Sequence, residues 1–251
     1  MADWDAATYD RVADPQEKWG RAVLERLELS GDETVLDAGC GSGRVTRLLL
    51  ERLPSGRVIG VDAAPSMIAV AREAFAGDER VELRVANLLE LELDRAVDAA
   101  FSNATFHWIL DHGRLFRGLF GALRPGGYLE AQCGGQDNVA EFTRAIEAAE
   151  GDERFSAYLR GIPSTYNFAS VDDTEYRLER AGFEVRRVWL EEDTWAPPEP
   201  RAFVSTVGLS QHLHRLPPGL RDAFIDAVLG SMARPLTLEY VRLNISARRP
   251  Q

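Results

Sequence analysis

The sequence predicts an α/β fold in which helices cover both faces of a largely parallel sheet. Apolar runs of strand length alternate along the chain with segments of helical periodicity, which is typical of βαβ units. The first run ends at Val35-Leu36 and passes through a glycine-rich turn into a helix expected over Val45 to Leu53. The second run ends in an acid, Asp62. Ligands bind at the carboxyl ends of strands in such folds, so these two turns predict the position of the site.

The remaining elements follow from the same periodicities. After the first unit we expect, in order, a strand over Arg57 to Asp62, a helix over Ser66 to Phe75 with Ser66 as its N-cap, strands over Val81 to Ala86 and Val97 to Ser102, a helix over Leu115 to Leu123, and a strand over Tyr128 to Cys133. The turn Arg124-Pro125-Gly126-Gly127 separates the last two elements. Two late strands are expected over Glu184 to Trp195 and Glu239 to Ala247.

An insertion lies between the two late strands, where a short hairpin would suffice to connect them. Prolines punctuate it, and two segments have helical periodicity, Arg201 to Leu209 and Leu220 to Met232. Long insertions of this kind are often functional. We therefore expect residues 197–235 to form a helical lid over the site, with His212 and His214 on the lid surface.

The segment from Asp37 to Gly43 carries most of the functional signal. Gly39, Gly41 and Gly43 alternate directly after a strand, so the backbone can approach a ligand without an intervening Cβ. Asp62 lies 19 residues beyond Gly43, where an acid at the tip of the second strand can accept hydrogen bonds from both hydroxyls of a ribose. This spacing predicts a pocket for a nucleoside-containing ligand.

The turn also indicates which ligand is favoured. A dinucleotide fingerprint, G-x-G-x-x-G, has its third glycine one turn into the helix, where this chain has Arg44. Asp37, two residues before the first glycine, would repel a pyrophosphate but suits an ammonium group. These features favour S-adenosylmethionine, which has an ammonium group and no phosphate, over NAD. A nicotinamide oxidoreductase is the less favoured alternative.

The pattern D-x-G-x-G-x-G, with Asp62 downstream, resembles motif I and the following acidic position of class I S-adenosylmethionine-dependent methyltransferases. The segment Asp98 to Trp108 resembles their motif IV, and Arg124 to Gly127 resembles the turn before their fifth strand. This resemblance implies a Rossmann-like seven-stranded sheet in the order 3-2-1-4-5-7-6, with the seventh strand antiparallel.

More closely, the chain is similar to the trans-aconitate methyltransferase family. The similarity rests on the opening, Trp4-Asp5 with Tyr9 and Ala13-Asp14, on Gln132 to Asn138, and on the helical insertion. It implies one domain over residues 1–251, with a helical N-terminal cap (1–30), a cofactor-binding core (31–150) and a substrate-side region (151–251) that carries the lid.

Applied to the matching positions of this chain, the resemblance implies one group of residues that binds the cofactor and one that binds the acceptor. Asn87 departs from the usual Asp beside the adenine, but its carbonyl can still accept from the N6 amine. Tyr9, His107 and Trp108 are expected at the acceptor, with His107 as the candidate catalytic residue. The cofactor-binding residues are expected to be Asp37, Gly39, Gly41, Gly43, Asp62, Ala63, Met67, Asn87, Leu88 and Asn103.

The expected function is methyl transfer from S-adenosylmethionine, with S-adenosylhomocysteine as product, to a small molecule. A carboxylic acid such as trans-aconitate is favoured as the acceptor, and a carboxylate needs no general base. A phenol or amine would need one, and His107 is then the candidate. An O- or N-methyltransferase of a natural product and a non-catalytic cofactor-binding module stay open as alternatives.

Composition limits the partners. Forty acidic and 29 basic residues give a net charge of −11, which disfavours nucleic acid. No apolar run approaches the roughly 20 residues that cross a bilayer, and no signal peptide is recognisable, so we expect a cytoplasmic protein without a membrane partner. Cys40 and Cys133 are expected to be buried thiols, and no metal site is expected.

Overall fold

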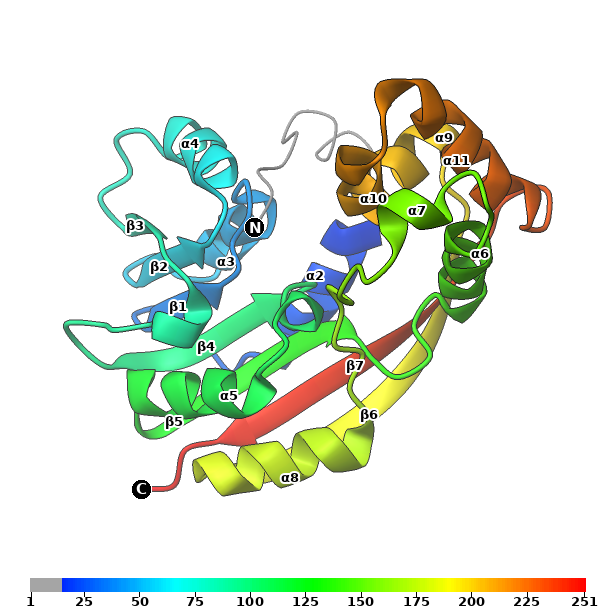
Figure 1. Cartoon of the computed structure of the whole chain (residues 1–251). Helices are drawn as coiled ribbons and strands as arrows, with labels where there is room; N and C mark the ends of the chain where they lie inside the picture. The colour runs from blue at the N-terminus through cyan, green and yellow to red at the C-terminus, as the bar shows by residue number, and fades with distance from the viewer. Residues whose placement is uncertain (1–14) are drawn as a thin grey trace.

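A computed structural model describes residues 15–251 as a seven-stranded sheet with helices on both faces (Figure 1). The strand order is β3-β2-β1-β4-β5-β7-β6, and β7 is antiparallel to both of its neighbours. Both features confirm the predicted topology. The strands are β1 (Thr34–Ala38), β2 (Arg57–Asp62), β3 (Val81–Val85), β4 (Val97–Asn103), β5 (Leu123–Gly134), β6 (Glu184–Trp195) and β7 (Leu238–Arg248).

Side chains that alternate along β1 divide the core into two layers. Val35 belongs to a buried cluster with side chains of α2 (Pro15–Arg26) and α3 (Arg44–Glu51). Leu36 belongs to the cluster on the opposite face, with α5 (His112–Ala122) and α8 (Val171–Ala181). Both side chains are fully buried. The continuous apolar run in the sequence therefore reflects a strand covered on both faces.

Several of the expected element boundaries are wrong; for example, α5 begins at His112 and not at Leu115, because Asp111 caps it. The helix expected from Ser66 is α4 (Pro65–Ala74), which begins one residue earlier, with Ala64 as its N-cap and Pro65 in the first turn. Proline suits this position because its fixed φ matches the helix and it has no N–H to satisfy. β5 begins at Leu123, and the proline-glycine segment forms an irregularity in its pairing with β4 instead of a turn outside the strand.

A separate helical layer stands at the carboxyl end of the sheet (Figure 1). The insertion between β6 and β7 is helical, as expected. It packs around a buried cluster with α6 and α7, which come from the connection after β5; for example, the rings of Phe155 and Phe224 meet edge to face at 5.2 Å. The elements of this helical layer are α6 (Ala140–Glu150), α7 (Ser156–Leu159), α9 (Pro200–Phe203), the π-helical turn η3 (Val204–Gly208), α10 (Ser210–Arg215) and α11 (Pro218–Gly230).

Arg26 fastens the C-terminal end of α2 to the sheet. The Arg26 guanidinium donates to the Glu130 carboxylate, to the Asn244 side-chain oxygen and to the Ala131 carbonyl, each at 3.0 Å. Only 3% of the Glu130 side chain is exposed, and burial raises its pKa although Ser246 and Arg26 oppose the shift. The arginine thus compensates a buried acid and fixes the helix above β5 and β7.

Removing this guanidinium should destabilise the fold. We expect Arg26→Met to lower the free energy of unfolding by about 3 kcal/mol, because Glu130 is left buried without its cation. Arg21→Met on the same helix is the matched control, since the Arg21–Glu17 pair is exposed and should contribute less than about 0.5 kcal/mol. Urea unfolding of both variants measures this, and equal losses would contradict the role given to Arg26.

Candidate active site

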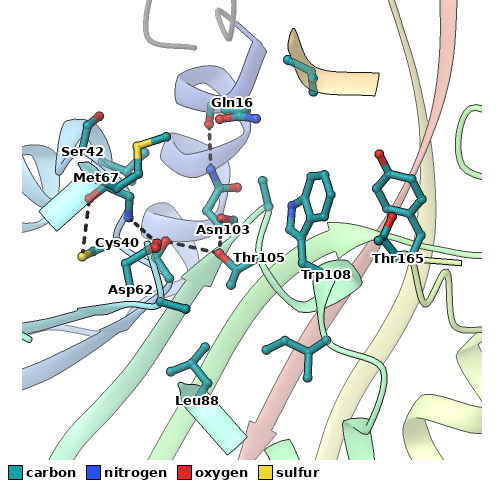
Figure 2. A pocket seen from close by; sticks show the side chains of 18 of the residues that line it. Gln16, Cys40, Ser42, Asp62, Met67, Leu88, Asn103, Thr105, Trp108 and Thr165 are labelled. Atoms are coloured by element: carbon teal, nitrogen blue, oxygen red, sulfur yellow. Dashed lines mark hydrogen bonds between the residues drawn. The ribbon is translucent and has the colours of Figure 1, made fainter. Parts of the chain in front are cut away.

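A cavity of about 530 Å³ lies at the carboxyl ends of the central strands, between the sheet and the helical layer. In Figure 2, Asp62 and Met67 lie on one side of it and Trp108 and Thr165 on the other, with Asn103 and Thr105 between them. Its lining comes from the turns that follow β1, β2, β3 and β4, from α2, from the connection between α7 and α8, and from the helical insertion.

The three alternating glycines all have positive φ, at +92°, +54° and +87° for Gly39, Gly41 and Gly43. A Cβ on Gly39 would lie 2.1 Å from the Thr105 hydroxyl, and one on Gly43 would lie 2.5 Å from the Phe75 ring. A Cβ on Gly41 would meet nothing within 4 Å. Gly39 and Gly41 line the cavity, whereas Gly43 is outside its lining and caps α3. Only Gly41 therefore faces open space.

Asp62 joins the first two strand-to-helix turns. Its Oδ2 accepts a hydrogen bond from the Gly41 N–H at 3.0 Å, and its Oδ1 accepts one from the Ala64 N–H at 2.8 Å. Burial raises the pKa of this carboxyl, and the backbone N–H groups oppose the shift. The carboxylate lines the cavity and retains lone pairs for a ligand.

Asp37 is the more deeply buried acid, with 2% of its surface exposed. Its Oδ2 accepts a hydrogen bond of 2.6 Å from the Thr46 hydroxyl. Burial raises the pKa of Asp37 to about 7; the Thr46 hydrogen bond opposes this shift, and the negative charge of Asp62 adds to it. Two acids that raise each other's energy in this way provide a favourable site for a cation.

The remaining residues expected at the cofactor also line the cavity. Met67 and Leu88 are buried, Ala63 is partly exposed and Asn87 is exposed. The Asn87 side-chain oxygen accepts the Leu89 N–H at 3.0 Å, which caps the short helix η1 (Leu88–Glu90). This bond directs the amide toward the turn while one lone pair of its oxygen is left for other donors.

Asn103 and Thr105 organise the turn after β4. The Asn103 Nδ2 donates to the Gln16 carbonyl of α2 at 2.9 Å, and its Oδ1 is buried without a hydrogen-bond partner among the described residues. The Thr105 hydroxyl lies 3.2 Å from the Gly39 carbonyl and 3.1 Å from that of Asn103. The glycine turn, this turn and α2 are thus held together at one edge of the cavity.

His107 lies outside the cavity lining, in contrast to the expectation from the sequence. It is 9% exposed, and its Nδ1 accepts a hydrogen bond of 3.1 Å from the Gly134 N–H. Burial holds the pKa of His107 well below its ordinary value, and the nearby Arg242 and His112 act in the same direction. The next residue of the turn η2 (Phe106–Trp108), Trp108, lines the cavity instead.

The side of the cavity that holds Trp108 is lined by two residues that the sequence analysis did not identify. The Tyr166 ring lies beside Trp108 with an angle of 47° between the planes and centroids 4.8 Å apart, and both residues line the cavity. His212 was expected on the lid surface, but it is 9% exposed and lines the cavity. Neither residue belongs to a recognisable motif, because both reach the site through tertiary packing. Tyr9, expected at the acceptor, lies outside the described residues.

The two cysteines are free and buried, as expected. Within residues 15–251, no group of three or more His, Cys, Asp or Glu side chains is placed to hold a metal ion. The same residues contain no helix that is both long and apolar enough to span a membrane.

Comparison with known proteins places the chain among methyltransferases. Residues 35–127 match a family model described as a methyltransferase domain. The trans-aconitate 2-methyltransferase of Methylobacterium radiotolerans is 36% identical over 240 residues, which cover 90% of this chain and 88% of that protein. The Escherichia coli protein of the same name is 36% identical over 188 residues, or 73% of each chain.

Solved structures share the fold. An S-adenosylmethionine-dependent methyltransferase from Mesorhizobium loti matches with a TM-score of 0.55 and 25% identity, over 94% of this chain and 99% of that one. Phosphoethanolamine N-methyltransferase 2 of Haemonchus contortus, in complex with phosphomonomethylethanolamine and S-adenosylhomocysteine, matches with a TM-score of 0.60 and 21% identity, over 93% and 53% of the two chains.

Fold, site and relatives together define an S-adenosylmethionine-dependent methyltransferase. More particularly, the chain belongs to the trans-aconitate 2-methyltransferase family. The resemblance found in the sequence is confirmed, and the relatives do not favour the alternative of a non-catalytic binding module.

The different surroundings of Gly39 and Gly41 make a testable contrast. Gly39→Ala should lower the free energy of unfolding by about 3 kcal/mol or more, because its Cβ would overlap Thr105 and its φ is strained for alanine. Gly41→Ala has room for its Cβ and should lose only about 1 kcal/mol from backbone strain. Urea unfolding measures both, and similar losses would contradict the close packing of Gly39.

Proposed function

We propose that this protein transfers the methyl group of S-adenosylmethionine to a carboxylate of a small polycarboxylic acid, with trans-aconitate as the favoured acceptor. The observation that carries the proposal is one continuous cavity with two different ends. One end has the glycine turn and two buried acids, and the other has an aromatic wall and polar lid residues. The name of the relatives supports the choice of acceptor.

The glycine-turn end fits the cofactor. Gly41 leaves the backbone open to a ligand, and Asp37 with Asp62 suits a cationic one. In the proposed arrangement Gly39 and Gly41 adjoin the methionine part and Asp37 attracts its ammonium group. Asp62 accepts from the ribose hydroxyls. Gly43 supports the turn from behind. The proposed adenine and methyl contacts are Ala63, Met67, Asn87, Leu88 and Asn103.

The cofactor supplies an already activated methyl group, so the protein mainly has to align the acceptor and exclude water. An ionised carboxylate attacks without losing a proton and therefore requires no general base. The buried, neutral His107, whose Nδ1 already accepts the Gly134 N–H, is consistent with a structural role in this mechanism. Trp108 in turn provides a wall for the acceptor.

The proposed partner is the small acceptor alone, and the proposed location is the cytoplasm. A net charge of −11 supports the absence of a nucleic-acid partner.

Methyl transfer from isotopically labelled S-adenosylmethionine tests the function directly. We expect label in trans-aconitate methyl ester, saturable binding of S-adenosylhomocysteine by calorimetry, and no binding of NAD. Asp62→Ala should weaken cofactor binding by about 1–3 kcal/mol, since the ribose hydroxyls lose a charged acceptor. If the protein binds the cofactor but labels none of a panel of small acids, a carboxylate acceptor is contradicted.

The buried position of Asp37 predicts how cofactor affinity depends on pH. With a pKa of about 7 in the ligand-free protein, Asp37 is mostly protonated at pH 5.5 and mostly ionised at pH 7.5. A bound cation favours the ionised form and lowers this pKa, so affinity for S-adenosylmethionine should rise about tenfold across this interval. Asp37→Asn should bind more weakly and lose this dependence. Calorimetry at several pH values measures it, and a flat wild-type profile would exclude Asp37 as the ammonium partner.

A further inference from the structure

Asp37 lies in the middle of the sheet, and its carboxyl group depends on a neighbouring helix for a hydrogen-bond donor. It is on the same face of β1 as Val35, which packs with side chains of α3. Its partners in the adjacent strands are Gly60 of β2 and Phe101 of β4, whose side chains cannot donate a hydrogen bond. Asp37 lines the cavity although only 2% of it is exposed. The donor comes from α3.

That donor is the hydroxyl of Thr46, a fully buried residue in the first turn of α3. Its Oγ1 lies 2.6 Å from the Asp37 Oδ2, and within residues 15–251 no other group donates to this carboxyl. The hydroxyl of a helical threonine commonly bonds a carbonyl of the preceding turn. Here its single hydrogen is directed to the carboxylate, which can only accept. The Asp37 Oδ1 has no partner among the same residues and is not enclosed, so it is the oxygen open to the cavity.

The other surroundings of Asp37 disfavour its ionised form. Burial, and with it the charge of Asp62 at the end of β2, raises the pKa of Asp37. Burial and then the charges of both acids raise the pKa of the Cys40 thiol in the glycine turn. Glu17 and Arg44 line the same cavity, but they pair with each other at 3.5 Å. Within the described part of the chain, the threonine hydroxyl is the group that stabilises the Asp37 carboxylate.

We infer that Thr46 is a positioning residue for the cofactor: its hydroxyl keeps the Asp37 carboxylate ionised, with Oδ2 engaged and Oδ1 open to the ammonium group of S-adenosylmethionine. The inference rests on the proposed function and extends it from the acid to the group that prepares the acid. Thr46 is outside the cavity lining, so it acts through Asp37. Loss of its hydroxyl should therefore weaken ligands that carry the ammonium group and spare those that lack it.

Three variants separate the hydroxyl from the shape of the side chain. Thr46→Val has nearly the same shape and no donor, whereas Thr46→Ser keeps the donor. Thr174→Val is the matched control, because Thr174 is also fully buried in the first turn of a helix, α8, and its hydroxyl donates to the Ser170 carbonyl at 2.7 Å. Thr174 is outside the cavity lining, so this variant measures the general effect of removing a buried hydroxyl.

Calorimetry with two ligands between pH 5.5 and pH 8.5 provides the measurement. S-adenosylhomocysteine carries the ammonium group, whereas 5′-methylthioadenosine keeps the adenosine and the sulfur but lacks the amino-acid part. Without the hydrogen bond the pKa of Asp37 rises further, so the carboxylate forms only at higher pH.

In Thr46→Val, the rise of S-adenosylhomocysteine affinity with pH should move upward by about one pH unit. At pH 6.5 this variant should bind S-adenosylhomocysteine about threefold more weakly than wild type or worse, and the difference should shrink toward pH 8.5. Thr46→Ser and Thr174→Val should keep the wild-type profile. The affinity for 5′-methylthioadenosine should be the same in wild type and all variants at each pH.

A pH profile that is flat in wild type or unchanged in Thr46→Val would overturn the inference. So would an equal loss of affinity for both ligands at every pH, which is the result that a purely structural role predicts. If Thr46→Val fails to fold, Thr46→Ala, which also lacks the donor, is compared with Thr46→Ser in the same way.

Failure of the proposed function looks different. A wild type that binds S-adenosylhomocysteine but methylates no acid contradicts only the proposed acceptor, and the binding profiles still test Thr46. A wild type that binds neither adenosine ligand overturns the inference together with the proposed cofactor site.

Discussion

The site depends first on the carboxylate of Asp62, which connects two turns that are distant in the sequence. It accepts the N–H groups of Gly41 and Ala64, while the carbonyl of the preceding Val61 accepts those of Gly39 and Cys40. The end of β2 thereby holds the glycine turn of β1 in its left-handed conformation. Because these bonds already orient the carboxylate, a ligand that binds there meets a group that needs no rearrangement, and less free energy is lost on binding.

The opposite wall of the cavity is an assembly of separate segments. Helix α2, fastened by Arg26, brings Gln16 to Asn103, and the connection after β5 and the insertion before β7 share a single buried cluster. Removing residues 197–235 would expose the apolar faces of α6 and α7, so this insertion is an integral part of the fold. This construction leaves the proposed acceptor end free to vary in chemistry, while the proposed cofactor end is constrained by the sheet.

The sequence predicted well the sheet and the position of the glycine turn and Asp62 beside the cavity, because these are encoded locally. Parallel strands are continuous apolar runs, and a glycine turn followed by Asp62 has a fixed spacing. The lining of the opposite end of the cavity was predicted poorly. In the turn 106–108, the Gly134 N–H bonds His107 and holds it away from the cavity, so that Trp108 faces the cavity. His212 reaches the cavity because Glu150 and Phe224 position its ring. Such contacts join segments far apart in the chain and leave no periodic signal in the sequence.

The central claim is that a single cavity binds the cofactor and the acceptor at opposite ends. A crystal structure of the protein with S-adenosylhomocysteine and trans-aconitate tests it most directly. The account predicts the ribose on Asp62 and the acid between Trp108 and His212, with one carboxylate facing the sulfur. An acid bound outside this cavity, or a cofactor whose ribose does not touch Asp62, would contradict it.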